Sequence, residues 1–269
     1  MPSSPYLCTG TLGRVLWESK ARAAAKAGFV RLSIYRHEHR QLRERGWDDL
    51  ALLNLLGDLN LKVAEYDGAV LTMQSPGDAE ETVAAAAAIG ARSITVLEHS
   101  GWQPGEHIDQ AAATLAEISD MAAEHDILVL IEPFAWSPLD DHRVAARIVE
   151  RADRPNAGLL LDTWHLCRGP EQGRLDPTID PAIIGAIQIA GTGPTPANPQ
   201  SPRQIAHECM HHRLLPGDGH TNIASLLGNL TTRGVNAPVG IEVFSDKLNT
   251  LNPETAAHQA KDSFDRLTL

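Results

Sequence analysis

The sequence lacks several features that mark whole classes of protein. Its three cysteines, Cys8, Cys167 and Cys209, are widely spaced and form no CxxC pair. We therefore expect free thiols in a reducing cytoplasm rather than disulfides or a thiolate zinc site. No signal peptide is visible at the N-terminus, and the apolar runs are too short to span a bilayer. These absences predict a cytoplasmic protein without a membrane partner.

Positive charge is scarce as well. The formal net charge is −11. Because binding to phosphate groups needs a basic surface, this charge disfavours nucleic acid as a partner. The chain also lacks a GxGxxG turn after its first strand-like segment, where it reads TGTLGR. That absence counts against an open, dinucleotide-binding sheet.

What is present is a regular alternation of strand-like and helix-like segments. Short β-branched or leucine-rich runs are separated by stretches with apolar residues at helical spacing. The expected strands are 6–9, 29–34, 61–67, 93–98, 128–132, 157–162, 185–190 and 238–243. The expected helices are 18–27, 48–59, 78–89, 108–124, 140–151, a short stretch near 177–184, 223–232 and 253–267.

Such an alternation has two main solutions, an open doubly wound sheet or a closed barrel. Eight strand–helix units fit the ~250 residues typical of a (β/α)8 barrel. We therefore predict a single TIM-barrel domain over residues 1–269. Residues 191–216, which are rich in proline and glycine, form an expected flap after the seventh strand.

Polar residues stand at the ends of four otherwise apolar strands. They are Glu132 in LVLIEPF, Asp162 in GLLLD, Gln188 in GAIQIAG and Glu242 in PVGIEVF. The carboxyl ends of barrel strands form the active site. Burying several ionised carboxylates is costly, and a shared divalent cation removes that cost. The oxygen donors favour Mn²⁺ or Mg²⁺ over Co²⁺ or Zn²⁺. The alternative for Gln188 is a core glutamine whose amide is hydrogen-bonded to the backbone.

Other side chains near these strand ends are candidates for substrate contact. His165 follows Asp162 by three residues and is a candidate acid or base; the alternative is a solvated loop histidine. Arg213 precedes a Pro-Gly turn and suits a hydroxyl, carboxylate or phosphate group, unless it is a surface arginine. His99, after the fourth strand, is a weaker candidate of the same kind.

Aromatic residues make up only 4% of the chain, yet several tryptophans fall just after predicted strands. We expect Trp102, Trp136 and Trp164 to form walls of a substrate pocket; the alternative is that they pack loops onto the barrel.

The expected flap contains HECMH at residues 207–211, which matches the metalloprotease pattern HExxH. A protease would leave the strand-end carboxylates unexplained. We expect instead that the proline and glycine content prevents a long regular helix, and that the flap is a basic lid over the site. The alternative is a mobile surface loop or an oligomer contact.

Together, LVLIEPF, GLLLDTWHLCRGP, GAIQIAG, HHRLLPGDGHTNI and PVGIEVFSD resemble the xylose-isomerase-like TIM barrels known as sugar phosphate isomerases and epimerases. The 3-dehydroshikimate dehydratases look similar. The resemblance implies that His165 and Arg213 touch substrate. It also implies the metal ligands Glu132, Asp162, Gln188 and Glu242. Endonuclease IV of the same superfamily needs a histidine-rich set for three zinc ions, which this oxygen-rich set and acidic chain do not match.

We therefore predict a metal-dependent isomerase or epimerase of a small sugar or polyol. Glu132 or Glu242 removes a proton from the carbon beside the substrate carbonyl. Return of the proton to the neighbouring carbon gives isomerisation, and return on the opposite face by the other glutamate gives epimerisation. Loss of a β-hydroxyl, with His165 as acid, would instead give a dehydratase of the 3-dehydroshikimate or inosose type. A polyol-binding barrel without turnover is the remote alternative. A homo-oligomer is left open.

Overall fold

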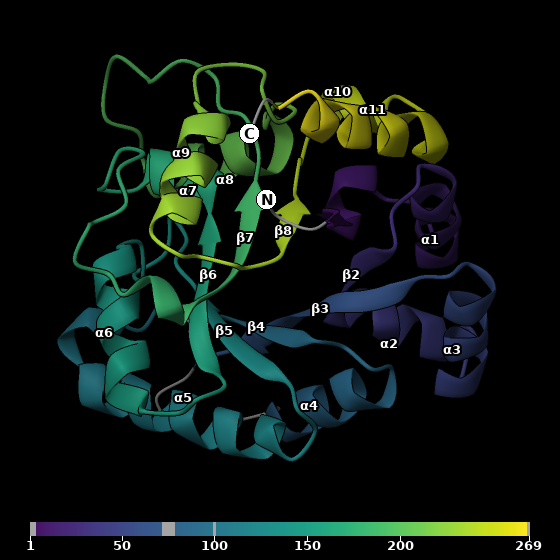
Figure 1. The fold of residues 1–269 in the computed structure, drawn as a ribbon, viewed down its shortest axis with the longest axis horizontal. Coiled ribbons are helices and arrows are strands. Elements are labelled where there is room, and N and C mark those ends of the chain that lie inside the picture. Colours follow the sequence, from purple (N-terminus) through teal and green to yellow (C-terminus); the bar gives the residue numbers. More distant parts are fainter. Residues whose placement is uncertain (1–3, 72–78, 99–100, 268–269) are drawn as a thin grey trace.

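The computed structural model describes residues 4–71, 79–98 and 101–267. Its strands form one closed, parallel barrel in which each strand pairs with its neighbours in sequence and β8 pairs with β1. The predicted (β/α)8 barrel is therefore confirmed (Figure 1). The strands are β1 Tyr6–Leu7, β2 Arg31–Tyr35, β3 Lys62–Val70, β4 Ser93–Leu97, β5 Leu128–Glu132, β6 Ala157–Asp162, β7 Ile184–Ile189 and β8 Val239–Ile241.

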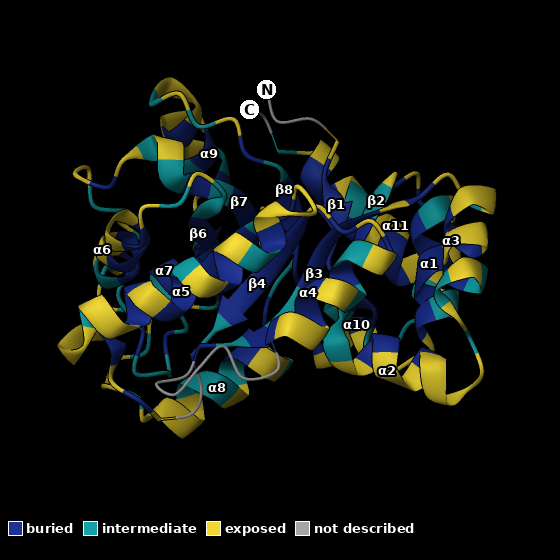
Figure 2. Ribbon diagram, turned by 90° about the horizontal axis from the view of Figure 1, so that it is seen from below, coloured by how far each residue is buried: buried dark blue, intermediate teal, exposed yellow. Residues whose placement is uncertain are grey.

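Helices surround the strands and bury their apolar faces against them (Figure 2). The helices are α1 Trp17–Lys26, α2 Arg36–Glu44, α3 Asp49–Asp58, α4 Ala79–Ala88, α5 Ile108–Ala123, α6 His142–Ala152, α7 Thr163–Arg168, α8 Pro202–His211, α9 Ile223–Thr232, α10 Asp246–Asn249 and α11 Pro253–Asp265. Short 3-10 turns lie at Thr9–Leu12, Pro104–Glu106 and Pro181–Ile183. The first and last long helices, α1 and α11, lie side by side and complete the helical ring.

The core follows from the sequence pattern. The strands are buried along most of their length because the barrel interior covers one face and the helices cover the other. Alanine fills the buried positions of the helices, for example Ala111, Ala112 and Ala122 of α5. These small side chains let the helices pack closely on the strands. None of the helices within the described residues is long and apolar enough to cross a bilayer.

The structure differs from the sequence prediction in several places. Helix α2 follows β2 directly, although its sequence RHEHRQLRE has little apolar signal. The expected short helix near 177–184 is a 3-10 turn at Pro181–Ile183. The helix α7 begins immediately after Asp162, whose side chain caps it by accepting from the backbone N–H groups of Trp164 and His165.

The predicted flap does contain a regular helix, so that expectation is corrected. Helix α8 begins at Pro202, with Ser201 and Gln204 forming a capping box. Proline at the first helical position costs nothing, since its missing N–H would have no partner there. Backbone bonds between Gly191 and Leu214 then close the base of the segment.

Candidate active site

The structure brings the four predicted strand-end residues to one end of the barrel. Glu132 and Asp162 are the last residues of β5 and β6. Gln188 pairs in register with Asp162 across β6 and β7. Glu242 follows β8 and donates its backbone N–H to the carbonyl of Ile189 on β7. None of these four residues is more than 5% exposed.

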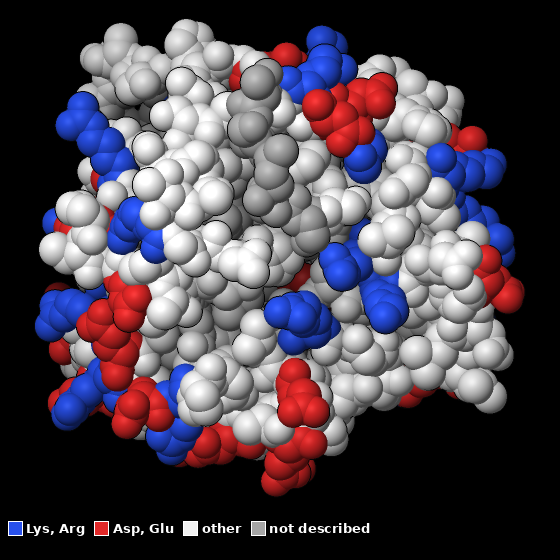
Figure 3. Space-filling view, viewed as in Figure 1, with Lys and Arg blue, Asp and Glu red and all other residues white. Residues whose placement is uncertain are grey.

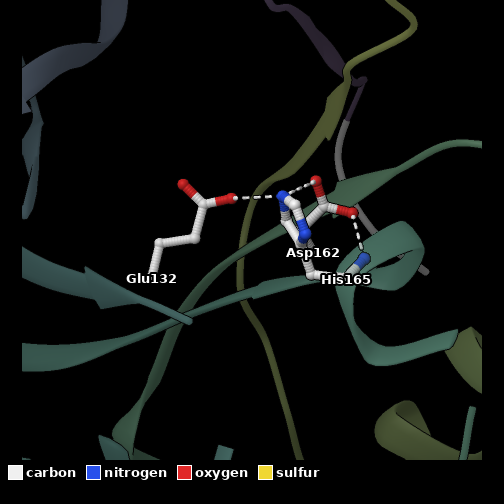
Figure 4. A group of neighbouring side chains, drawn as sticks. All are labelled: Glu132, Asp162 and His165. Carbon is white, nitrogen blue, oxygen red and sulfur yellow. Dashed lines mark hydrogen bonds and ion pairs between the residues drawn. The ribbon is translucent and has the colours of Figure 1, made fainter. Parts of the chain in front are cut away.

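His165 lies between two of these carboxylates. Its Nε2 is 3.9 Å from Glu132 Oε1 and 3.9 Å from Asp162 Oδ2 (Figure 4). Its Nδ1 lies 3.2 Å from the backbone N–H of Ala135 and accepts from it. Helix α7 places the ring there, since His165 belongs to the first turn that Asp162 caps. The predicted proximity of His165 to the strand-end carboxylates is thus observed.

Arg213 is the cation of this cluster and is only 1% exposed. Its Nη1 lies 2.7 Å from Asp162 Oδ2 and 3.3 Å from Glu242 Oε2. Its guanidinium also lies 5.2 Å from the ring of Trp164 and 5.0 Å from the ring of Phe244. Arg213 therefore lies beneath the flap helix among the strand-end carboxylates, and it is not a surface arginine.

Burial and mutual repulsion shift the proton affinities of these groups. Burial, reinforced by Glu242 and Asp162, raises the pKa of Glu132 well above its ordinary value. Burial raises the pKa of Glu242 to about 8 despite the opposing charge of Arg213. Burial acts in the same direction on Asp162, but Arg213 and His165 outweigh it and lower the pKa of this carboxyl. The cluster thus pairs one ionised carboxylate with two that hold protons readily.

Burial also lowers the pKa of His165 to about 3. The imidazole is therefore neutral near pH 7 and acts as a hydrogen-bonding group rather than a cation.

Sequence reasoning missed a second layer of polar residues. Glu65, in the middle of β3, is 2% exposed and accepts from Tyr6, Thr95 and Gln188. Tyr35, the last residue of β2, donates its hydroxyl to Glu242 Oε1 at 3.0 Å. The sequence does place Glu65 directly after the apolar residues Val63 and Ala64, but Lys62 and Asp67 in the same stretch, LKVAEYDG, make this carboxylate less distinct than those at the strand ends.

The donor set fits a divalent cation. Glu132 Oε1 and Gln188 Oε1 are buried and have no hydrogen-bond partner among the described residues. Single ligand atoms of Glu132, Asp162 and His165 all lie within 4.8 Å of one another. Buried oxygens without partners are costly unless a cation or water satisfies them. Glu132, Asp162, Gln188 and Glu242 could hold a hard cation, and His165 adds a nitrogen that Zn²⁺ or Co²⁺ accepts.

The predicted aromatic walls differ in their exposure. Trp164 is fully buried, so it packs inside the site rather than facing an open pocket. Trp136 is half-buried and its ring lies 4.9 Å from the His165 ring, while Trp102 is 8% exposed. His99 lies outside the described residues. The cysteines are free thiols as predicted, and Cys209 Sγ lies 2.9 Å from Arg213 Nη2.

The HExxH segment does not have the arrangement of a protease. His207 and His211 are on the exposed end of α8, with ring centroids 4.5 Å apart. Glu208, which would serve as the base, is paired with Arg168. His211 is paired with Asp246.

A cavity of about 800 Å³ lies beside the site, between the end of the flap helix α8 and the loop that follows β1, and its lining residues are neighbours of the carboxylate cluster rather than members of it. Tyr35, which donates to Glu242, and Phe244, which packs on Arg213, both line it. Arg14, His37 and His211 are also in its lining. The cavity is large enough for a small polar molecule.

A family model for xylose isomerase-like TIM barrels matches residues 21–267. The chain belongs to this family. The curated relatives that this xylose isomerase-like barrel matches carry the names of enzymes. A 3-dehydroshikimate dehydratase of Pseudomonas aeruginosa is 28% identical over 138 residues, which are 50% of this chain and 20% of that protein. An inosose isomerase of Halalkalibacterium halodurans is 28% identical over 152 residues, 55% of this chain and 51% of that protein.

The matched segment thus spans about a fifth of the length of the dehydratase and about half the length of the isomerase. Solved structures of similar fold cover almost the whole barrel. The IolI protein with a bound zinc atom has a TM-score of 0.85, is 17% identical and covers 98% of both chains. D-allulose 3-epimerase from Methylomonas sp., in complex with D-allulose, has a TM-score of 0.71 and is 18% identical, covering 99% of this chain and 98% of that one. At these identities the likeness shows the fold alone.

Proposed function

We propose that the protein is a divalent-metal-dependent isomerase or epimerase of a small sugar or polyol. The observation that carries this proposal is the buried carboxylate cluster, in which Glu132 Oε1 and Gln188 Oε1 have no hydrogen-bond partner within the part of the chain that the structure describes. Arg213 supplies only one positive charge to Asp162 and Glu242. A divalent cation would complete the charge balance and bind the free oxygens.

In this proposal Glu132, Asp162, Gln188 and Glu242 hold the cation. A divalent cation supplies Lewis acidity, which acidifies the proton beside a chelated carbonyl and stabilises the resulting enediolate. Mn²⁺ and Mg²⁺ match the oxygen donors, and the nearby His165 makes Zn²⁺ and Co²⁺ the next candidates. The zinc atom bound to the similar IolI barrel supports a divalent ion as the bound metal.

The proton transfers are assigned to Glu132 and Glu242. They reach the cluster from β5 and β8, on either side of Asp162 on β6. Burial raises the pKa of Glu242 to about 8, so this carboxyl can take a proton and return it near neutral pH, and burial raises the pKa of Glu132 as well. His165, neutral and held by Ala135, donates a hydrogen bond to the substrate. Arg213 keeps Asp162 ionised.

The charge distribution supports a small-molecule substrate. Figure 3 shows basic side chains interspersed with acidic ones, rather than gathered into one broad basic area on this face. Together with the net charge of −11, this supports the proposal that nucleic acid is not the substrate.

A screen for turnover tests the proposal. Ketoses, inososes and 3-dehydroshikimate are incubated with the Mn²⁺-loaded protein in deuterated water, and carbon-bound deuterium is followed by NMR. We expect solvent deuterium at the carbon beside the carbonyl, because Glu132 and Glu242 exchange their protons with water. Loading with metal but no exchange on any of these substrates would contradict the proposed proton transfer and favour a binding barrel.

Dehydration is the second candidate, because one of the matched relatives is named a 3-dehydroshikimate dehydratase. It shares the first proton abstraction and differs in the loss of a β-hydroxyl, to which the neutral His165 would donate a hydrogen bond. The same screen separates the two reactions. A dehydratase forms a product lighter by one water, whereas an isomerase or epimerase leaves the mass unchanged apart from deuterium.

A further inference from the structure

The side-chain amide of Gln188 is hydrogen-bonded through its nitrogen but, among the described residues, not through its oxygen. Its Nε2 donates to both carboxylate oxygens of Glu65, at 3.1 and 3.2 Å. Its Oε1 is buried and has no partner among the described residues. A glutamine that served only to fill the core would have both ends of its amide satisfied. The unsatisfied end is the one that can bind a cation.

Glu65 is itself fixed by two other donors. Tyr6 donates its hydroxyl to Glu65 Oε2 at 2.7 Å, and Thr95 donates to Oε1 at 2.6 Å. These three residues come from β1, β3 and β4, so the network crosses the inside of the barrel. Glu65 is 2% exposed, which leaves little room for water to replace a partner. The carboxylate therefore presents only acceptor oxygens to the Gln188 amide.

The register of β6 and β7 places Gln188 beside Asp162 of the carboxylate cluster. Gln188 and Asp162 are register partners on adjacent parallel strands, so their side chains share one face of the sheet. Neighbouring strands lie ~4.8 Å apart. With the nitrogen turned toward Glu65, the oxygen is turned away from it.

We propose that Glu65 is a positioning residue that orients the Gln188 amide so that its oxygen, and not its nitrogen, faces the cation. This inference rests on the proposed function, because it takes Gln188 as a metal ligand. An amide oxygen has lone pairs for a cation, whereas the amide NH₂ has none to offer. Partners of this kind typically change metal affinity by ~10- to 100-fold.

The experiment is a double-mutant cycle read by metal affinity. Free and bound Mn²⁺ are measured by electron paramagnetic resonance for the wild type, Glu65→Gln, Gln188→Ala and the double variant. Glu65→Gln keeps the size of the side chain but adds an NH₂ group, which lets the Gln188 amide turn over. We expect it to weaken Mn²⁺ binding ~10-fold or more in the wild-type background, and less than ~2-fold in the Gln188→Ala background.

The cycle separates orientation from simple loss of charge. A charge effect of Glu65 acts equally with and without the Gln188 side chain, so equal weakening in both backgrounds would overturn the proposal. Unchanged binding by Glu65→Gln would overturn it too. Asp67→Asn is the matched control, because it removes a carboxylate from the same strand that makes no bond to Gln188 among the described residues. Its effect should be the same in both backgrounds.

The outcome also distinguishes this inference from the proposed function. If the wild type binds Mn²⁺ and Asp162→Asn abolishes binding, the metal site stands, and an additive cycle rejects only the role of Glu65. If the wild type binds no Mn²⁺, both are rejected. Thermal unfolding of each variant shows whether it is folded. If Glu65→Gln does not fold, Thr95→Val takes its place in the cycle. This variant removes one hydrogen bond that holds Glu65 and should show the same coupling to Gln188.

Discussion

Removing the charge of Glu242 should change how the stability of the metal-free protein depends on pH. Burial raises the pKa of Glu242 to about 8 from an ordinary value of 4.5, although Arg213 opposes the shift. The folded protein therefore binds this proton more tightly than the unfolded chain does. The stabilisation is complete below the unfolded pKa and is lost as the pH rises through the folded one.

The size of the effect follows from the pKa difference. One unit corresponds to ~1.4 kcal/mol, so a rise from about pH 5.5 to about pH 8 should reduce the free energy of unfolding by ~3 kcal/mol through Glu242 alone. Glu132 acts in the same direction, because its pKa is also raised. For a chain of this size, that is a fall in Tm of roughly 6–12 °C.

The assay is thermal unfolding of chelator-treated protein at a series of pH values. The wild type should lose stability across this range, and Glu242→Gln should lose ~3 kcal/mol less, because its neutral amide does not ionise. Glu150→Gln, on the exposed side of α6, is the matched control and should follow the wild type. Adding Mn²⁺ should remove the fall, since the cation binds the ionised carboxylates. A Glu242→Gln variant with the wild-type pH slope would refute the reasoning.

Further outcomes follow from the same cluster. Glu132→Gln and Asp162→Asn should each leave less than about a tenth of the bound metal found in the wild type by elemental analysis; full occupancy would remove that residue from the ligand set. Glu242→Gln should lower kcat on the identified substrate ~100-fold or more, and activity within a few-fold of wild type would exclude its proton transfer. Arg213→Met should destabilise the metal-free protein by ~3–5 kcal/mol in urea unfolding, because it leaves buried carboxylates unpaired; an unchanged midpoint would contradict this. Substrate should protect the flap from trypsin at exposed Arg203, and equal cleavage with saturating ligand would show that it is not a lid.

The strand-end residues could be predicted because the barrel imposes a simple rule. Strands that are covered on both faces read as apolar, so a carboxylate such as Glu132 or Asp162 stands out. Its place at the carboxyl end of the strand then indicates the functional face. The alternation of strands and helices was predictable for the same reason, since each element has a periodic apolar pattern.

Glu65 was missed because it does not stand at the end of its strand. β3 continues to Val70, five residues beyond Glu65, so the strand-end rule does not find it. Its role depends on donors from β1, β4 and β7, which no local pattern connects. Helix α2 was missed for a related reason. It buries two polar side chains, Glu38 through an ion pair with Lys20 and His39 through a hydrogen bond with Asp49, rather than an apolar stripe.

The position of Arg213 shows how tertiary structure changes the meaning of a motif. In the sequence it follows three histidines in a segment rich in proline and glycine, which favours an exposed lid. In the structure the backbone N–H of Arg213 donates to Phe244, directly after β8, and this contact directs the side chain into the barrel mouth. There it pairs with Asp162 and Glu242, whereas Glu132 lies 3.9 Å from Nε2 of the neutral His165. When Glu132 and Glu242 lose their protons, a divalent cation would balance the negative charge that develops on them, and these are the two residues to which we assign proton transfer.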